Sequence, residues 1–339
     1  MKKEAILYER LDSNNVHCFL CAHNCRIADA DFGICGMRQN NSGVLYTFAY
    51  DQVVAANVDP VEKKPLFHFL PGSQTFSVAT MGCNFKCSFC QNWQISQINF
   101  RDSNDPATAK KLSPGEIVDL ALQHECRSIS YTYTEPTIFF EYALEIMKLA
   151  KKKGLYNLFV TNGFMSRDCL ELARGFLDAA NVDLKFFDDS FYQKICGARL
   201  KPVLDSIRFM HEIGIWVEVT TLLIPKQNDS PEQLKGIADF LSGVDKDMPW
   251  HISAFHPDYK LSHLPPTDLD SLEKAYKIGK DALLRYVYVG NLRGIREDTF
   301  CPSCGKKLIL RHGFSVEENK ISSGRCSYCN GIIKGIFNE

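Results

Sequence analysis

The sequence predicts an α/β fold, a partial (β/α)6 TIM-type barrel with small cysteine-rich N-terminal and zinc-ribbon-like C-terminal segments. Strand-like and helix-like stretches alternate between residues 75 and 290, which is typical of a parallel sheet with helical crossovers. Groups of cysteines precede this region and follow it. We therefore expect a cysteine-rich segment with a metal site over 1–70, a barrel over 71–290 and a ribbon-like segment over 291–339.

The composition favours a globular protein that binds metal in a reducing compartment. With 339 residues, 45% of them hydrophobic, the chain exceeds one average domain and can bury a sizeable core. A net charge of −1 gives no global positive field for nucleic acid or an anionic membrane, and no apolar run approaches the ~20 residues of a spanning helix. The 14 cysteines, without an export signal, indicate metal ligands in the cytoplasm rather than disulfides.

The first segment contains four cysteines with metal-ligand spacing. Cys18, Cys21, Cys25 and Cys35 follow the pattern C-x2-C-x3-C-x9-C, so four thiolates are available for a tetrahedral zinc site or a fully ligated second cluster. Four ligands leave no open position, which favours a structural metal over an electron-transfer cluster. We expect His23, which lies between them, to form a hydrogen bond rather than to replace a cysteine.

Periodicity and capping signals predict the elements in order. Ser113 and Glu116 form a capping box with proline at the first helical position, and Ser230 and Thr267 are expected to cap two later helices. Strands are predicted over residues 43–50, 52–57, 74–80, 127–132, 156–161, 179–184, 215–224, 250–255 and 285–289. Helices are predicted over 117–123, 136–153 and 167–176, after Ser230, and from Thr267 to about residue 284.

A third group of cysteines follows the first predicted barrel strand. Cys83, Cys87 and Cys90 have the spacing C-x3-C-x2-C directly after residues 74–80, and catalytic groups of a barrel lie at such strand ends. A [4Fe-4S] cluster normally takes four cysteine thiolates, so three thiolates leave one iron without a protein ligand. An open coordination position indicates chemistry rather than a purely structural site. The alternative is a zinc knuckle or a set of unrelated buried thiols.

Residues 81–92 resemble the cluster loop of the radical S-adenosylmethionine (radical SAM) superfamily, including the aromatic Phe89 directly before the last cysteine. The ending Cys90-Gln91-Asn92 is similar to the pyruvate formate-lyase-activase-like branch. The whole chain is most similar to the AmmeMemoRadiSam system radical SAM enzyme family. The resemblance implies six parallel strands and a [4Fe-4S] cluster whose open iron binds S-adenosyl-L-methionine (SAM). It also implies reductive cleavage of SAM to methionine and a 5'-deoxyadenosyl radical, which is oxygen-sensitive chemistry suited to an anaerobic cell.

Polar residues at the carboxyl ends of the later strands are candidates for binding SAM, because ligands of a parallel barrel lie there. SAM carries an ammonium, a carboxylate, a ribose diol and an adenine. Glu135 is expected to pair with the ammonium and Lys185 with the carboxylate. The ribose region is expected to meet Thr161, Asn162 and Asp183, and the adenine to meet the ring of Phe89.

The resemblance supports the same positions, with two departures. Thr134 and Glu135 stand where the superfamily usually has a Gly-Gly-Glu-Pro run, so backbone contacts are expected to differ while Glu135 keeps its role. His256 matches a histidine at the sixth strand that approaches SAM. Val160 replaces an aspartate that helps activases to hold a monovalent cation, so the resemblance does not extend to a cation site beside SAM.

The C-terminal segment carries a zinc-ribbon signal. Two C-x2-C pairs are separated by 21 residues, and zinc would stabilise a segment that is too small for a core of its own. The expected ligands are Cys301, Cys304, Cys326 and Cys329. Basic residues around them are offset by acidic ones, so nucleic-acid binding is not expected. The remaining cysteines, Cys126, Cys169 and Cys196, are isolated in the sequence and are expected to be small buried hydrophobic residues.

These observations predict a radical SAM enzyme that uses a [4Fe-4S] cluster, SAM and zinc and that modifies an unidentified substrate. The alternatives are an activase of a glycyl radical enzyme and a non-catalytic module that binds metal or RNA. The expected partner is a reducing electron donor such as flavodoxin or ferredoxin. The family name also implies Memo-type and AMMECR-type proteins as collaborators.

Overall fold

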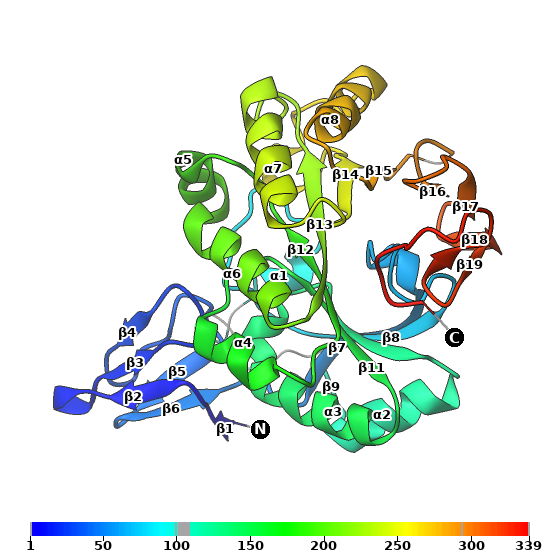
Figure 1. The fold of residues 1–339 in the computed structure, drawn as a ribbon. Helices are drawn as coiled ribbons and strands as arrows, with labels where there is room; N and C mark the ends of the chain where they lie inside the picture. Colours follow the sequence, from blue (N-terminus) through cyan, green and yellow to red (C-terminus); the bar gives the residue numbers. More distant parts are fainter. Residues whose placement is uncertain (1, 99, 101–108, 293, 338–339) are drawn as a thin grey trace.

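The computed structural model describes residues 2–98, 100, 109–292 and 294–337. Its largest element is a sheet with the strand order β15-β14-β13-β12-β11-β10-β8-β7-β9. The strands are β7 (Gln52–Pro60), β8 (Gln74–Thr80), β9 (Lys110–Lys111), β10 (Ser128–Tyr131), β11 (Tyr156–Thr161), β12 (Ala179–Asp183), β13 (Trp216–Leu223), β14 (Trp250–Ala254) and β15 (Val287–Gly290). The predicted α/β class is confirmed, and Figure 1 shows a curved sheet with helices along its outer side.

The strands β8 and β10 to β15 run parallel to their neighbours. The described sheet therefore has seven parallel strands rather than the six that the resemblance implies, because β15 continues the parallel order beyond β14. At the other edge, β7 is antiparallel to β8 and to β9. Residues 52–57, assigned from the sequence to the N-terminal segment, thus form part of the central sheet.

Local capping signals set most helix boundaries. The helices are α1 (Trp93–Ser96), α2 (Pro114–Gln123), α3 (Phe140–Lys152), α4 (Arg167–Ala173), α5 (Asp189–Phe191), α6 (Leu200–Glu212), α7 (Pro231–Val244) and α8 (Leu269–Asp281). The capping box of Ser113 and Glu116 is present at the start of α2, and Ser230 caps α7. The expected cap at Thr267 is wrong: Asp268 caps α8, because the Thr267 hydroxyl instead donates to the carbonyl of Leu223.

Two helix predictions need further correction. The stretch predicted as one helix from residue 136 begins with the 3-10 helix η3 (Pro136–Phe139), and α3 starts only at Phe140. Helix α6 was missed from the sequence, although its apolar residues Val203, Ile207 and Met210 recur at helical spacing and are buried.

The N-terminal segment forms two small antiparallel sheets beside the barrel, and Cys18 and Cys25 lie on one of them. One sheet has the order β2-β3-β4 and the other β1-β6-β5. Their strands are β1 (Lys3–Glu4), β2 (Tyr8–Arg10), β3 (Val16–Cys18), β4 (Cys25–Ile27), β5 (Arg38–Asn41) and β6 (Val44–Thr47). In Figure 1 these blue strands stand out to one side of the barrel.

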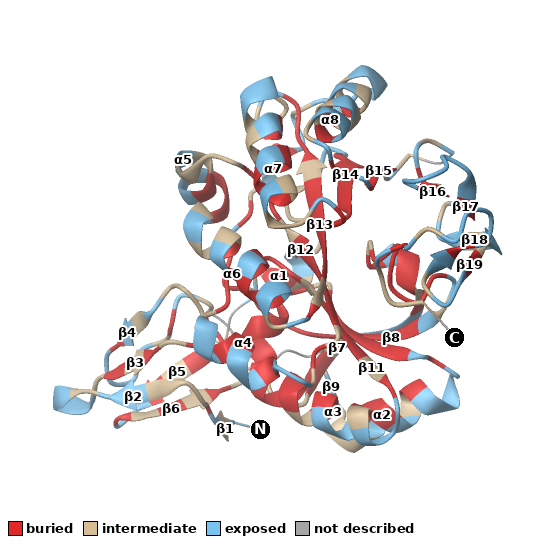
Figure 2. Ribbon diagram, in the orientation of Figure 1, coloured by how far each residue is buried: buried red, intermediate tan, exposed pale blue. Residues whose placement is uncertain are grey.

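Residues 61–70 close the barrel at the amino ends of its strands. Leu66 and Phe69 pack with Leu158 and Ala179, which lie near the beginnings of β11 and β12. The buried carboxylate of Glu218 accepts the backbone N–H groups of residues 67 and 68 at 2.9 and 2.8 Å. Since this end is filled, the interior is accessible from the carboxyl ends of the strands, and the strands themselves are largely buried (Figure 2).

The C-terminal segment packs against the barrel rather than standing apart from it. Its strands are β16 (Thr299–Phe300), β17 (Lys307–His312), β18 (Ser315–Asn319), β19 (Ile321–Ser322) and β20 (Arg325–Cys326). Leu308 and Ile309 share an apolar cluster with Phe67 and with Tyr288 of β15. The buried guanidinium of Arg311 donates to the carbonyl of Phe67 at 2.7 Å, which ties the ribbon to the segment that closes the barrel.

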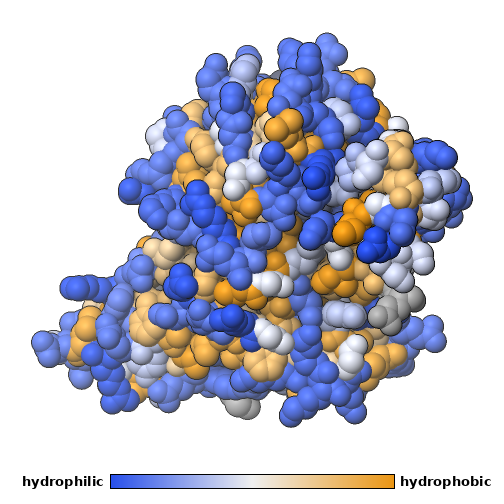
Figure 3. Space-filling view, in the orientation of Figure 1, coloured by the Kyte–Doolittle hydropathy of each residue, from blue (hydrophilic) through white to orange (hydrophobic). Residues whose placement is uncertain are grey.

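The outer surface is mixed in character. The face drawn in Figure 3 is mainly hydrophilic over α7 and α8, with smaller hydrophobic areas below them. Within the described ranges, none of the helices has both the length and the apolar character needed to cross a bilayer.

Candidate functional site

A cavity of about 550 Å³ opens at the carboxyl ends of β8 and β10 to β14. This volume lies in the range of small-molecule sites. The cavity brings together the three central cysteines and most residues predicted to bind SAM. Those in its lining are Cys83, Cys87, Cys90, Phe89, Thr134, Glu135, Thr161, Asn162, Asp183 and Lys185.

The three cysteines lie on a loop that is held from two sides. The N–H groups of Lys86 and Ser88 donate to the carbonyls of Cys196 and Ile195 in the π-helical turn Tyr192–Cys196, at 2.8 and 3.0 Å. Gly82 precedes the first cysteine with φ +87°, and a Cβ there would lie 2.5 Å from the Met37 side chain. Only glycine therefore lets the loop turn while it packs against the N-terminal segment.

Hydrogen-bond donors already face two of the sulfurs. The N–H of Phe85 lies 3.3 Å from the Sγ of Cys83, and the Ser96 hydroxyl lies 3.1 Å from the Sγ of Cys90. Burial raises the pKa of Cys83 and of Cys90, so these thiols favour the neutral form unless a bound metal compensates the thiolate charge. The donor set therefore fits a metal cluster bound by three thiolates.

Cys196 is a neighbour of the cluster loop that sequence reasoning missed. Its thiol forms a hydrogen bond with Cys87, and this contact together with burial raises the pKa of Cys87. Cys196 is fully buried and is absent from the cavity lining, so it lies behind Cys87 and does not face the cavity. The sequence gives no signal for this contact, because only the turn after β12 brings the two residues together.

The carboxylate of Glu135 is fixed by donors from two strand ends. Its Oε1 accepts from the N–H of Thr137 at 3.0 Å and from the hydroxyl of Thr161 at 2.8 Å, and its Oε2 accepts from the N–H of Asn162 at 2.8 Å. The Thr137 hydroxyl adds a further bond at 2.5 Å. Glu135 is 2% exposed, and burial raises its pKa while these donors lower it in part. A cationic group in the cavity would complete its coordination.

Asp183 and Lys185 form an ion pair in the same lining. The Lys185 Nζ lies 2.8 Å from the Asp183 carboxylate and 5.6 Å from the centre of the Phe89 ring. Burial lowers the pKa of Lys185, but the nearby Asp183 and Cys87 outweigh burial and raise it well above the usual value. Lys185 is thus a permanent cation beside the cysteine loop, and Asp183 already occupies part of its hydrogen-bonding capacity.

Two further predicted residues form hydrogen bonds within the protein. The Thr134 hydroxyl donates to the carbonyl of Thr80 at 2.7 Å, so it joins two strand ends. The Asn162 side chain donates to Asn84 at 2.7 Å and lies 3.9 Å from the Sγ of Cys83, so it faces the cysteine loop. Both residues still line the cavity.

The prediction that His256 lies at the site is wrong. His256 is exposed and does not line the cavity, because the preceding Phe255 is buried and its N–H is held by the Thr267 hydroxyl at 2.8 Å. Ser253 of β14 lines the cavity in its place. Val160 also lines the cavity, so an apolar side chain occupies the position that carries an aspartate in activases.

Several lining residues carried no signal in the sequence analysis. They are Lys63, Lys64, Thr220, Leu222 and Asn291. Lys64 is 2% exposed, pairs with Asp59 at 2.7 Å and lies 4.6 Å from the centre of the Tyr133 ring. The strand β7 leads Lys63 and Lys64 to the cavity, and a fold prediction that assigned them to an N-terminal segment separate from the barrel could not place them there.

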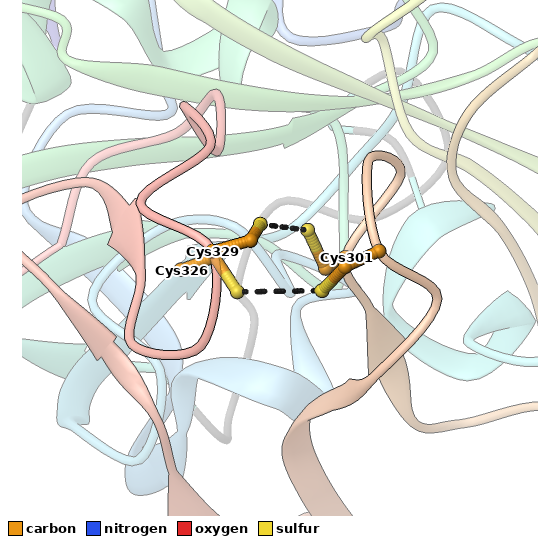
Figure 4. Close-up of side chains that lie close together, drawn as sticks. Cys301, Cys326 and Cys329 are labelled. Atoms are coloured by element: carbon orange, nitrogen blue, oxygen red, sulfur yellow. Dashed lines mark hydrogen bonds between the residues drawn. The ribbon is translucent and has the colours of Figure 1, made fainter.

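The C-terminal cysteines form a compact group. The Sγ atoms of Cys301 and Cys329 lie 3.6 Å apart, and those of Cys304 and Cys326 lie 3.8 Å apart. Figure 4 shows the thiols of the two knuckles facing each other. All four sulfurs lie within 4.8 Å of one another, so this group could hold a metal ion.

The N-terminal cysteines are neighbours in space. Cys18 of β3 lies directly opposite Cys25 of β4 in the antiparallel pair. Burial, followed by the neighbouring thiols of the group, raises the pKa of Cys21. The guanidinium of Arg38, 1% exposed, lies 3.6 Å from the Sγ of Cys18 and pairs with the buried Glu141.

The sequence of this chain is similar to those of known proteins. The sequence model of the Radical SAM superfamily matches residues 77–241, which span β8 to α7. An uncharacterized protein of Methanocaldococcus jannaschii is 41% identical over 96% of this chain and 97% of its own length. A second protein of that organism, provisionally named a glycyl-radical enzyme activating enzyme, is 30% identical over 63% of this chain and 79% of its own.

More distant similarities agree with this fold. The pyruvate formate-lyase-activating enzyme of Clostridium pasteurianum is 24% identical over 63% of this chain and 92% of its own. Among solved structures, a radical SAM methyltransferase from Sphaerobacter thermophilus superposes with a TM-score of 0.53 at 18% identity, over 70% of this chain and 71% of that chain. At this identity the superposition supports the fold alone.

Proposed function

Because this chain belongs to the radical SAM superfamily, we propose that Cys83, Cys87 and Cys90 hold a [4Fe-4S] cluster and that the cavity beside them binds SAM. When bound, the cluster supplies the electron that cleaves SAM to methionine and a 5'-deoxyadenosyl radical. The observation that carries the proposal is that a carboxylate, an ammonium group and an aromatic ring, which complement the charges and the adenine of SAM, line one cavity with three thiols.

The chain's own residues would bind and orient SAM. Glu135 presents a carboxylate, fixed by Thr137, Thr161 and Asn162, to the SAM ammonium. Lys185 lies on the same lining and offers a cation to the SAM carboxylate. The walls of the cavity would exclude water from the reactive intermediate.

The proposed cluster keeps an open coordination position only if no fourth thiolate reaches the cavity. A fourth thiolate would close the cluster and remove the place where SAM binds. Among the described residues, the cysteine in contact with the loop is Cys196, and it lies behind Cys87 rather than in the lining. The arrangement therefore suits a cluster with one iron left for SAM.

Two classes of radical SAM enzyme, which differ in their substrate, are candidates for this chain. The similarity to activating enzymes supports activation of a glycyl radical enzyme as a second candidate, while the overall resemblance supports an AmmeMemoRadiSam enzyme that works with Memo-type and AMMECR-type proteins. We further propose a flavodoxin or ferredoxin as electron donor, zinc at the C-terminal cysteines, and action in an anaerobic cytoplasm. These proposals rest on the family resemblance and the cysteine chemistry.

The test is SAM cleavage by anaerobically reconstituted protein. Reduction with dithionite should release methionine and 5'-deoxyadenosine, measured by chromatography, whereas the variant Cys83→Ala/Cys87→Ala/Cys90→Ala should release neither. Absence of cleavage by protein with about four irons at this loop would refute the enzymatic proposal and favour a non-catalytic metal-binding module. A glycyl radical signal in a co-expressed partner would favour the activase.

A further inference from the structure

Two lysines in the cavity lining have no part in the proposed binding of SAM. Lys63 and Lys64 lie in the segment that closes the amino ends of the barrel strands, at the end of the 3-10 helix η2 (Val61–Lys63) and directly after it. Glu135 and Lys185, in contrast, follow the carboxyl ends of β10 and β12. The cavity thus has a second charged region, deeper in the barrel than the one assigned to SAM.

The two ammonium groups share one carboxylate. Asp59 accepts from the Nζ of Lys63 through Oδ1 and from the Nζ of Lys64 through Oδ2, each at 2.7 Å. Ser77 donates to the same Oδ2 at 2.8 Å, and the hydroxyl of Tyr133 donates to it as well. Burial raises the pKa of Asp59, but these donors outweigh burial and hold it well below its usual range. One permanent negative charge therefore opposes two positive ones.

Lys64 keeps its charge although its side chain is buried. Burial lowers its pKa to about 8, because the bond to Asp59 offsets burial only in part, so the ammonium form prevails at pH 7. An ammonium group carries three N–H donors. In the described part of the chain, Lys63 and Lys64 each donate one hydrogen bond, to Asp59. Both groups therefore have donors left for a second acceptor.

Tyr133 is held in a strained backbone conformation beside Lys64. Its φ is +64°, in the left-handed region that residues with a Cβ seldom adopt. The side-chain amide of Asn92 donates to the Tyr133 carbonyl at 2.9 Å and fixes this turn after β10. The ring lines the cavity, and its centre lies 4.6 Å from the Nζ of Lys64. Strain of this kind persists where the surroundings enforce it, and it clusters at ligand sites.

The excess positive charge of this region is not matched by SAM. SAM carries an ammonium, a sulfonium and a carboxylate. The ammonium is assigned to Glu135 and the carboxylate to Lys185, which also pairs with Asp183. None of these groups opposes the second positive charge of Lys63 and Lys64. A cavity region of one sign attracts the opposite charge, and the attraction is strong where water is excluded.

We infer that Lys63 and Lys64 bind an anionic group, a carboxylate or a phosphate, of a small-molecule substrate. The word substrate rests on the proposed function, whereas the anion site itself does not. Because residues 61–70 fill the amino end of the barrel, the anionic group enters from the carboxyl ends of the strands and passes the SAM site. The rest of the molecule then lies between the lysines and SAM.

Anion binding by the anaerobically reconstituted protein tests the inference, with pyrophosphate and malonate as the probes. Isothermal titration calorimetry in the presence of saturating SAM should give a Kd for at least one of them. Lys64→Met should raise that Kd about ten- to hundredfold, because a hydrogen bond between charged groups is lost. Binding of pyrophosphate alone would support the inference with a phosphorylated substrate, and binding of malonate alone would support it with a carboxylate.

Matched variants separate a local effect from a loss of the fold. Lys63→Met changes a side chain that is 44% exposed and keeps the buried pair of Lys64 and Asp59, so it remains informative if Lys64→Met does not fold. It should weaken binding of the same probe. Lys235→Met removes a lysine that pairs with Asp239 on helix α7, outside the cavity, and should leave the Kd unchanged.

Three results would overturn the inference: no binding of either probe to the wild type, equal affinity in the wild type and both cavity variants, or equal weakening in Lys235→Met. A loss of SAM affinity in Lys64→Met that exceeds the loss of probe affinity would also overturn it, because the lysine would then serve SAM.

The proposed function fails separately from the anion site. Protein that binds a probe through Lys64 but cleaves no SAM after reduction would refute the radical chemistry and keep the anion site. Protein that cleaves SAM but binds neither probe would keep the proposed function and overturn the inference.

Discussion

Replacement of Glu135 by glutamine gives the sharpest test of the SAM site. The carboxylate is 2% exposed, lines the cavity and is held by the donors of Thr137, Thr161 and Asn162. Glutamine keeps the shape but removes the charge that would meet the SAM ammonium. A hydrogen bond to a charged group contributes about 1.5–3 kcal/mol, so the Kd for SAM should rise roughly ten- to hundredfold.

The same substitution also has a structural cost, which needs a matched control. In either orientation of the amide, its NH2 group faces an N–H or O–H group that donated a hydrogen bond to the carboxylate. Two donors cannot bond to each other, so the substitution should lower the free energy of unfolding by about 1–3 kcal/mol. Glu218→Gln should show the same kind of cost, because Glu218 is fully buried and accepts from Phe67, His68 and His251. Glu218 does not line the cavity, so SAM affinity should be unchanged in this variant.

The assay is a titration of the reduced cluster with SAM, followed by electron paramagnetic resonance at equal iron content. A Glu135→Gln protein with wild-type SAM affinity would refute the pairing with the ammonium. An equal loss of affinity in both variants would show that destabilisation, not the missing charge, causes the effect.

Three further outcomes follow from the structure. A Cys87 thiolate bound to iron can only accept a hydrogen bond, so the Cys196 thiol beside it would donate and stabilise the reduced state of the proposed cluster; Cys196→Ala should therefore lower its reduction potential, and Cys126→Ala should leave the potential unchanged in the same redox titration. Cys304→Ser should lose about one zinc per chain by metal analysis and should lower the Tm, because a zinc ion at these four cysteines would hold the small ribbon together; an unchanged zinc content would contradict the ribbon assignment. Burial lowers the pKa of His68 to about 4, below that of the unfolded chain, so the unfolded state binds more protons and stability is lost as the pH falls from about 6.5 towards 4. Between pH 7.5 and 5 this loss should reach about 2 kcal/mol in urea unfolding and should be absent in His68→Gln.

The sequence by itself determined the features that depend on spacing and period. The alternating strands and helices predicted the α/β fold, and the capping box at Ser113 predicted the start of α2. The C-x3-C-x2-C loop after β8 identified the cysteines of the cavity, because neighbouring residues of one loop converge whatever the rest of the chain does. Strand ends supplied seven of the predicted SAM contacts, of which six line the cavity and His256 does not; Phe89, predicted from the cysteine loop, also lines it.

Only the tertiary structure decided which distant residues meet. Cys196 reaches Cys87 from a turn after β12, and Lys64 reaches the cavity through β7; neither contact leaves a periodic signal in the chain. The distance between thiols within a metal site is likewise a property of packing, because a cysteine motif fixes only their spacing along the chain. Among the described residues, the sulfurs of Cys301, Cys304, Cys326 and Cys329 gather within 4.8 Å of one another only because the strands and turns that carry them pack together.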